Sequence, residues 1–231
     1  MFIVSDILSL LPASVSGLAP PLQVGQKLPP EVEERVKEVV NKDEHRPIMI
    51  YVPRHCGCPF PERDLHHLYA LISKNLSLFE NAHVRILVLP HANTPQACQQ
   101  WFDAVFDAAA AASKDTPKEE QYRRIKDLFH LIPDPAPSRT LAKSLSFGSL
   151  GTFGALFGRE SLGEVMNLKK DRGIKNRETA EGSNRWTEHG AVWVISGSGD
   201  EGSIVKCVDK PAVASRECDW SKGWKEAGIE I

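Results

Sequence analysis

Short apolar runs alternate along the chain with segments whose apolar residues recur at helical spacing. The runs at residues 47–53, 83–90 and 128–133 have the length and the flanking prolines or charges of buried strands. Two further runs, 191–196 and 203–209, are joined by a glycine-rich turn segment and predict a hairpin. Helical spacing predicts four helices, over residues 30–40, from 59 to about 76, over 95–112 and over 218–227.

This order of elements predicts an α/β fold. The first two strands and the helix between them form a βαβ unit, which is almost always right-handed. Parallel strands first and an antiparallel hairpin last predict a thioredoxin-like fold, with a central mixed sheet, flanking helices and a C-terminal β-hairpin. We expect an N-terminal arm and lead-in at 1–30, then a domain at 31–231 with an insertion at about 135–185.

Composition narrows the classes of partner. The 231 residues are 42% hydrophobic and 25% charged with a net charge of −2, which gives no reason to expect nucleic acid as a partner. No run reaches the roughly 20 apolar residues of a membrane span, and the N-terminus lacks the positive region of a signal peptide. Five irregularly spaced cysteines indicate reduced thiols and a cytoplasmic location.

Two cysteines lie where the first predicted strand gives way to a helix. Pro59 suits the first helical position, which makes Cys58 the thiol at the helix N-terminus. Free backbone N–H groups and the helix dipole stabilise a thiolate there, and Arg54 and His55 add cationic groups. The pattern predicts a low pKa for Cys58 and places Cys56 in the loop.

Residues 48–60, which read Ile-Met-Ile-Tyr-Val-Pro-Arg-His-Cys-Gly-Cys-Pro-Phe, resemble the signature of fungal thioredoxin-like proteins of the AhpC/TSA, or peroxiredoxin-like, type. Residues 176–195 are similar to a second block of that family, in which Arg185 and Trp186 match its Arg-Trp pair. The resemblance implies a thioredoxin fold and thiol chemistry. Pro61 stands where the family's second cysteine would be, Thr187 replaces a common glutamine, and no Thr-Pro or Val-Pro precedes the hairpin.

The first hypothesis is therefore a thiol-dependent oxidoreductase, peroxiredoxin-like or glutaredoxin-like. Its substrate would be a small molecule (a peroxide, a thiol or a metabolite). It would need no tightly bound cofactor, and glutathione or a thioredoxin-type reductant would reset the thiol. The candidate catalytic residues are Cys58, Cys56, Arg54, His55 and Arg185, and the candidate substrate-binding residues are Phe60, Pro61, Trp186 and His189.

Two alternatives stay open. One is a non-redox enzyme of fungal specialised metabolism, with a small-molecule pocket beside residues 54–60, covered by the glycine- and phenylalanine-rich segment 147–158. There, Arg54, His55 or His189 would act as acid, base or oxyanion donor. The other is a non-catalytic binding or scaffold protein in which the apolar arm at residues 1–12 pairs two copies as a homodimer. Apart from that hypothesis, we expect this arm to pack on the domain, with a membrane or partner contact as the alternative.

Other chemistry-bearing residues have plainer interpretations. Cys98 and Cys207 fall within a predicted helix and strand and are expected to be buried, inert thiols. Cys56 and Cys58 with His66 or His67 form an incomplete ligand set, so no metal site is expected. A basic cluster could attract an anionic substrate such as glutathione, or form a solvated helix end; it comprises Lys169, Lys170, Arg172, Lys175 and Arg177.

Overall fold

The computed structural model describes residues 16–40, 45–113, 119–152, 158–174, 177–198 and 201–231. It is an α/β protein built on a five-stranded mixed sheet with the order β3-β2-β1-β4-β5. β1, β2 and β3 are parallel, β4 is antiparallel to β1, and β5 is antiparallel to β4, which confirms the α/β class and the C-terminal hairpin. The strands are β1 (Pro47–Val52), β2 (Arg85–Val88), β3 (Phe129–Leu131), β4 (Gly190–Ile195) and β5 (Ile204–Asp209).

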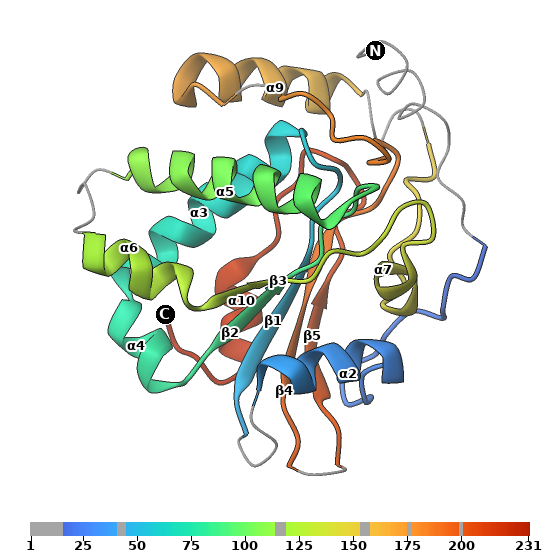
Figure 1. Cartoon of the computed structure of the whole chain (residues 1–231), viewed down its shortest axis with the longest axis vertical. Coiled ribbons are helices and arrows are strands. Elements are labelled where there is room, and N and C mark those ends of the chain that lie inside the picture. The colour runs from blue at the N-terminus through green and yellow to red at the C-terminus, as the bar shows by residue number, and fades with distance from the viewer. Residues whose placement is uncertain (1–15, 41–44, 114–118, 153–157, 175–176, 199–200) are drawn as a thin grey trace.

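Helices cover both faces of the sheet (Figure 1). α3 (Pro59–Lys74), α5 (Pro95–Ala111) and α10 (Trp220–Glu226) pack on one face, and α2 (Pro30–Val39) and α7 (Thr140–Ser144) on the other. The described helices also include α4 (Leu76–Asn81), α6 (Glu119–Lys126) and α9 (Arg159–Arg172). α9 lies across the end of the molecule at the top of Figure 1, beside α3 and α5.

The central strand shows why the sheet is covered on both sides. Met49 and Tyr51 point into the core beneath α3 and α5, while Ile48, Ile50 and Val52 point toward α2 and α7. All five side chains are fully buried, and a strand buried on both faces reads as a continuous apolar run.

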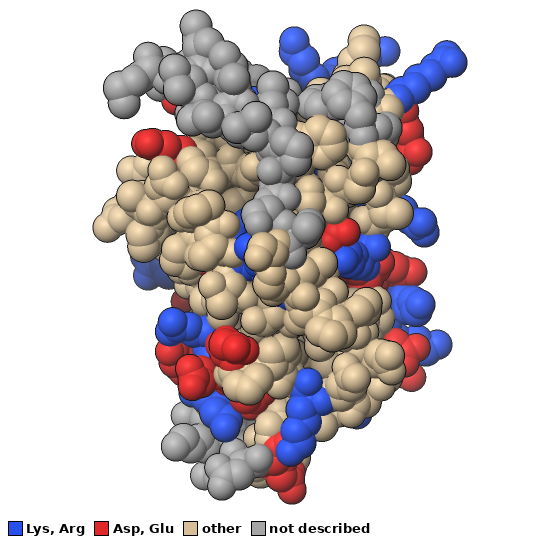
Figure 2. Space-filling view, turned by 90° about the vertical axis from the view of Figure 1, so that its right-hand side faces the viewer, with Lys and Arg blue, Asp and Glu red and all other residues tan. Residues whose placement is uncertain are grey.

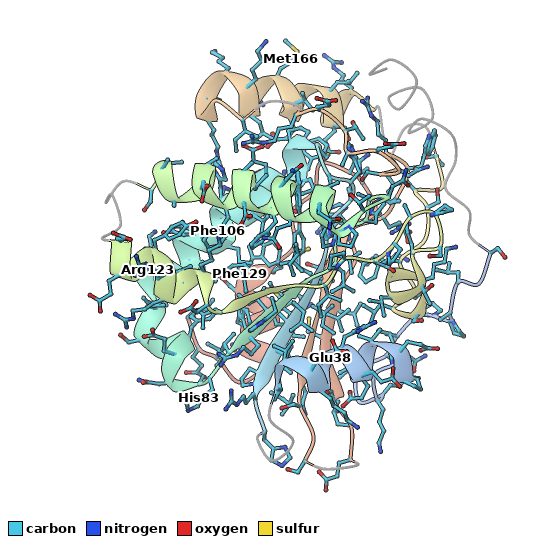
Figure 3. The ribbon with its side chains drawn as sticks, viewed as in Figure 1. Glu38, His83, Phe106, Arg123, Phe129 and Met166 are labelled. Atoms are coloured by element: carbon cyan, nitrogen blue, oxygen red, sulfur yellow. The ribbon has the colours of Figure 1, made fainter. Side chains whose placement is uncertain are left out.

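Aromatic rings fill the larger of the two cores. Phe106 of α5 packs edge-on against Phe129 of β3, with ring centroids 5.1 Å apart, and against Tyr69 of α3 at 5.3 Å (Figure 3). Trp193 of β4 makes similar contacts with Trp220 and Trp224 of α10. These contacts fix the helices of this face relative to the sheet.

The lead-in segment protects the open edge of the sheet. Gly25 N–H donates to the carbonyl of Val205 at 2.9 Å, Val205 N–H donates to Gln26 at 2.9 Å, and Leu28 N–H donates to Ser203 at 3.0 Å. These bonds occupy backbone groups of β5 and of Ser203 just before it, which would otherwise be open to another chain.

Four of the described helices, α4, α6, α7 and α9, lie outside the helices that the sequence predicts. α6 lies in the strongly charged segment before β3 and buries Ile125. α9 was not predicted, because it buries only Ser161 and Leu168 and so carries no apolar stripe. The expected arm at 1–12 lies outside the described residues, as do residues 153–157 of the expected flap.

The surface carries no block of one charge on the face turned toward the viewer in Figure 2, where basic and acidic side chains are interspersed. Among the described helices, none has both the length and the apolar character needed to cross a membrane.

Candidate thiol site

Cys58 caps the N-terminus of α3, at the end of a short loop that follows β1. Pro59 occupies the first helical position. The Cys58 side chain is only 3% exposed and lies in a small apolar cluster with Phe60, Leu150 and Leu168. The loop and helix thus place the thiol where the sequence predicts it, but inside the protein.

Arg54 is the principal polar partner of this thiol. Its Nη1 donates to Cys58 Sγ at 3.6 Å, and its Nη2 donates to the carbonyl of Arg185. The Arg54 side chain is 2% exposed, and among the described residues no carboxylate forms an ion pair with it. The guanidinium carbon also lies 5.9 Å from the centre of the Phe60 ring. A buried cation therefore faces the thiol without a competing carboxylate.

Burial raises the pKa of the Cys58 thiol, and Arg54 and the Phe60 N–H lower it only in part. The low pKa expected from the sequence is therefore not found in this conformation. The expectation counted the helix N-terminus and the cations but not the loss of water around the sulfur, which disfavours the charged form.

The second sequence block packs along the cysteine loop. Arg177 N–H donates to the carbonyl of Gly57 at 3.0 Å, Ala180 N–H donates to Cys56 at 3.1 Å, and Cys56 N–H donates to Ser183 Oγ at 2.9 Å. Gly57 has a φ of +116°, and a Cβ there would lie 2.8 Å from the carbonyl oxygen of Glu178 in the facing segment. Only glycine fits this close approach.

Side chains reinforce the same junction. Arg177 donates to the Glu62 carboxylate through Nε at 2.7 Å and Nη2 at 2.9 Å. Thr187 Oγ1 donates to the carbonyl of Arg54. Trp186 packs against the apolar cluster that contains Cys58. The two blocks quoted from the sequence are therefore one structural unit around the thiol.

Two buried histidines, His55 and His189, lie beside this unit, and their lowered pKa values favour the neutral ring. Burial, with Arg54 and Arg185 nearby, holds the pKa of His55 well below its ordinary value. Burial lowers the pKa of His189 to about 4. His189 Nε2 donates to the carbonyl of Arg216 at 2.8 Å, while Nδ1 of each ring is buried without a hydrogen-bond partner among the described residues.

A polar network beneath the site was missed by the sequence reasoning. Asp64 is fully buried, accepts from the Tyr51 hydroxyl at 3.0 Å and pairs with Arg63 at 2.7 Å. Burial raises the pKa of Asp64 to about 6. The available signal was spacing, because Asp64 precedes Leu68 and Ile72 by four and eight residues and so shares their apolar face.

Cys56 belongs to a different environment from Cys58. It lies in the core beneath α5, where its Sγ is 3.7 Å from the carbonyl oxygen of His91. Of the remaining expected site residues, Phe60 and Pro61 are buried in the first turn of α3. The structure thus gathers Cys58, Arg54, Phe60, the Arg185 carbonyl and Trp186, with His55 and His189 beside them.

The basic cluster is divided in the structure. Arg177 is paired with Glu62, and Arg172 at the end of α9 contacts the His67 ring. Lys169 and Lys170 lie in the last turn of α9, and Lys175 is outside the described residues. Within the described part of the chain, no three histidine, cysteine, aspartate or glutamate side chains gather as a metal-binding group.

Two pockets bounded by described residues lie away from the thiol. One, of about 430 Å³, lies between the lead-in and the hairpin and includes Lys27 and His45. The other lies against α10 and includes Asp219 and Lys225. Neither includes any of residues 54–60.

Fold and site together define an α/β protein with a buried cysteine, contacted by arginine, at the start of a helix. Comparison of the chain with models of protein families, with curated proteins and with solved structures gave no match.

Proposed function

We propose that this protein is a thiol-dependent oxidoreductase of peroxiredoxin-like or glutaredoxin-like type, in which Cys58 is the nucleophile on a thioredoxin-like fold. The observation that carries the proposal is the contact of Arg54 with the Cys58 sulfur at 3.6 Å, at the start of α3. The strand order, with three parallel strands and a C-terminal antiparallel hairpin, supports the fold assignment.

The charge arrangement favours a reaction that makes the sulfur negative. A buried guanidinium is costly unless it faces an anion or strong acceptors, and Arg54 faces a thiol and a carbonyl. The thiolate form of Cys58 would give Arg54 the negative partner that the described carboxylates do not supply. Any motion that admits water or substrate to the sulfur also relieves the burial that raises its pKa.

The proposed reaction uses a hydroperoxide as the oxidant. The Cys58 sulfur forms a bond to one peroxide oxygen, the O–O bond breaks, and the leaving oxygen takes a proton to give an alcohol. The resulting sulfenic acid reacts with a thiol such as glutathione, which releases water and forms a mixed disulfide. A second thiol then attacks this disulfide and restores Cys58.

The reductant and compartment follow from the same chemistry. The five cysteines are free in the structure, which supports a reducing compartment such as the cytoplasm. Glutathione or a thioredoxin-type protein would supply the electrons.

The test compares Cys58→Ser with Cys207→Ser, which alters a buried thiol in β5. We expect Cys58→Ser to abolish glutathione-dependent peroxide consumption and Cys207→Ser to retain it. Full consumption by Cys58→Ser would refute the proposal. Circular dichroism of both variants would establish that each is folded.

A second candidate is the non-redox enzyme on the same fold. The raised pKa of the Cys58 thiol favours it, because a protonated thiol is a poor nucleophile. Alkylation of the reduced protein against pH separates the two. Selective modification of Cys58 supports the redox function, while uniformly slow cysteines favour the alternative.

A further inference from the structure

Cys56 and Cys98 meet in the core although they come from different elements. Cys56 lies in the loop before α3, and Cys98 lies in the first turns of α5. Both side chains are fully buried in the same core cluster. Cys56 Sγ is 3.7 Å from the carbonyl oxygen of His91 and Cys98 Sγ is 3.6 Å from that of Pro90, so both sulfurs lie against one stretch of backbone.

This contact distinguishes the pair from an inert buried thiol. The two thiols influence each other: the pKa of Cys56 is raised by the neighbouring Cys98, and that of Cys98 is lowered by the neighbouring Cys56. A thiolate held by a neighbouring thiol has both its nucleophile and its resolving group in place.

The backbone on both sides holds the pair in position. Cys56 is fixed through its N–H to Ser183 and its carbonyl to Ala180. The start of α5 is fixed by Thr94, whose Oγ1 accepts from the Ala97 N–H at 3.2 Å. Because both backbone segments are anchored, a bond between the two sulfurs would form by rotation of the cysteine side chains.

We propose that Cys56 and Cys98 form a reversible disulfide when the protein meets a hydroperoxide. The Cys98 sulfur bonds to a peroxide oxygen, the O–O bond breaks, and the leaving oxygen departs as water or an alcohol. Cys56 then attacks the Cys98 sulfenic acid; its proton leaves with the hydroxyl group as a second product water, and the S–S bond forms. A dithiol reductant reverses the reaction by thiol–disulfide exchange.

The disulfide would join the cysteine loop to α5. Both thiols would lose their bonds to the carbonyls of Pro90 and His91, and the loop that positions Cys58 would be tied to the core. The inference stands apart from the proposed function, because its chemistry uses neither Cys58 nor Arg54.

The experiment maps disulfides in the full-length chain after hydrogen peroxide treatment. Free thiols are blocked with N-ethylmaleimide in denaturant, and the protein is digested with trypsin. Trypsin leaves Cys56 and Cys58 on one peptide, residues 55–63, so Cys58→Ser is used beside the unaltered protein to separate them.

In both proteins we expect a peptide that links residues 55–63 to the Cys98 peptide, with a loss of about 2 Da for two hydrogens. Dithiothreitol should remove the link, and Cys207→Ser should leave it unchanged. Alkylated Cys56 and Cys98 after peroxide treatment, in the folded protein, would overturn the inference. Loss of the link in Cys58→Ser would also overturn it, since Cys58 would then be required.

The outcomes for the two proposals separate. A Cys58→Ser protein that forms the link but does not consume peroxide with glutathione supports both. A Cys98→Ser protein should lack the link but still consume peroxide with glutathione. That result would show that the Cys56–Cys98 disulfide is not needed for the proposed function of Cys58.

Discussion

His189 provides a quantitative test of the buried site. Its ring is fully buried just before β4, with Nε2 donating to the Arg216 carbonyl at 2.8 Å. We consider the replacement His189→Gln, because a glutamine amide can still donate a hydrogen bond but does not titrate. The variant therefore removes one proton equilibrium while keeping a polar group at the position.

The expected magnitude follows from the lowered pKa. Burial takes the pKa of His189 from 6.5 to about 4, so between these values the unfolded chain binds a proton that the folded chain does not. The free energy of unfolding therefore falls as the pH drops from 6.5 to 4. A shift of this size corresponds to about 3 kcal/mol.

Asp64 contributes with the opposite sign. Its pKa is raised from 3.8 to about 6, so the folded protein holds a proton there that the unfolded chain has lost. The stability from Asp64 is present below pH 3.8 and is lost as the pH rises through 6, by about 3 kcal/mol in all. The two groups oppose each other between pH 4 and 6, so only single variants reveal them.

Urea unfolding between pH 7.5 and 4.5 measures both effects. The stability advantage of the unaltered protein over His189→Gln should shrink with acidification, and its advantage over Asp64→Asn should grow. His83→Asn is the matched control, because His83 is an exposed histidine at the turn before β2, at the lower end of the molecule in Figure 3. If the free energy of unfolding changed with pH in the same way for His189→Gln and the unaltered protein, the reasoning would be refuted.

Three further substitutions test close contacts. Gly57→Ala should lower the free energy of unfolding by about 2 kcal/mol in urea, because its φ is +116° and a carbonyl would lie 2.8 Å from the new Cβ. Gly223→Ala would put a Cβ 2.2 Å from the Trp193 ring, which should cost about 3 kcal/mol and change the near-UV circular dichroism. Arg54→Gln should move alkylation of Cys58 to higher pH, since it removes the cation that lowers that pKa; an unchanged profile would contradict this.

Much of the fold can be predicted from the sequence, because the spacing of apolar residues indicates which side chains are buried. The apolar run at 47–53 predicts a strand covered on both faces, and β1 is one. α5 likewise follows from Trp101, Phe102, Val105 and Phe106 on one side of a helix. α9 could not be found this way, because most of its side chains face outward; Met166, for example, is 72% exposed and projects from the helix (Figure 3).

The candidate site is predictable only in part, for a different reason. Sequence spacing places Cys58 at the start of α3, since proline at the first helical position is a local signal. Burial of Arg54 and Cys58 depends on residues 177–187, more than 100 positions away, and no local pattern reports that contact. This non-local burial is what raises the pKa of the thiol that local features alone would lower.

The contact with residues 177–180 also explains why two cysteines separated by one glycine do not act as a pair. Gly57 presses against the facing backbone, so the thiols on either side of it enter different cores. Cys58 contacts Arg54, and Cys56 lies in the same core cluster as Cys98. The proposed thiol chemistry therefore requires no Cys-x-Cys disulfide: a single loop places one thiol against an arginine and the other in the core that holds Cys98, and each can be altered without removing the neighbour of the other.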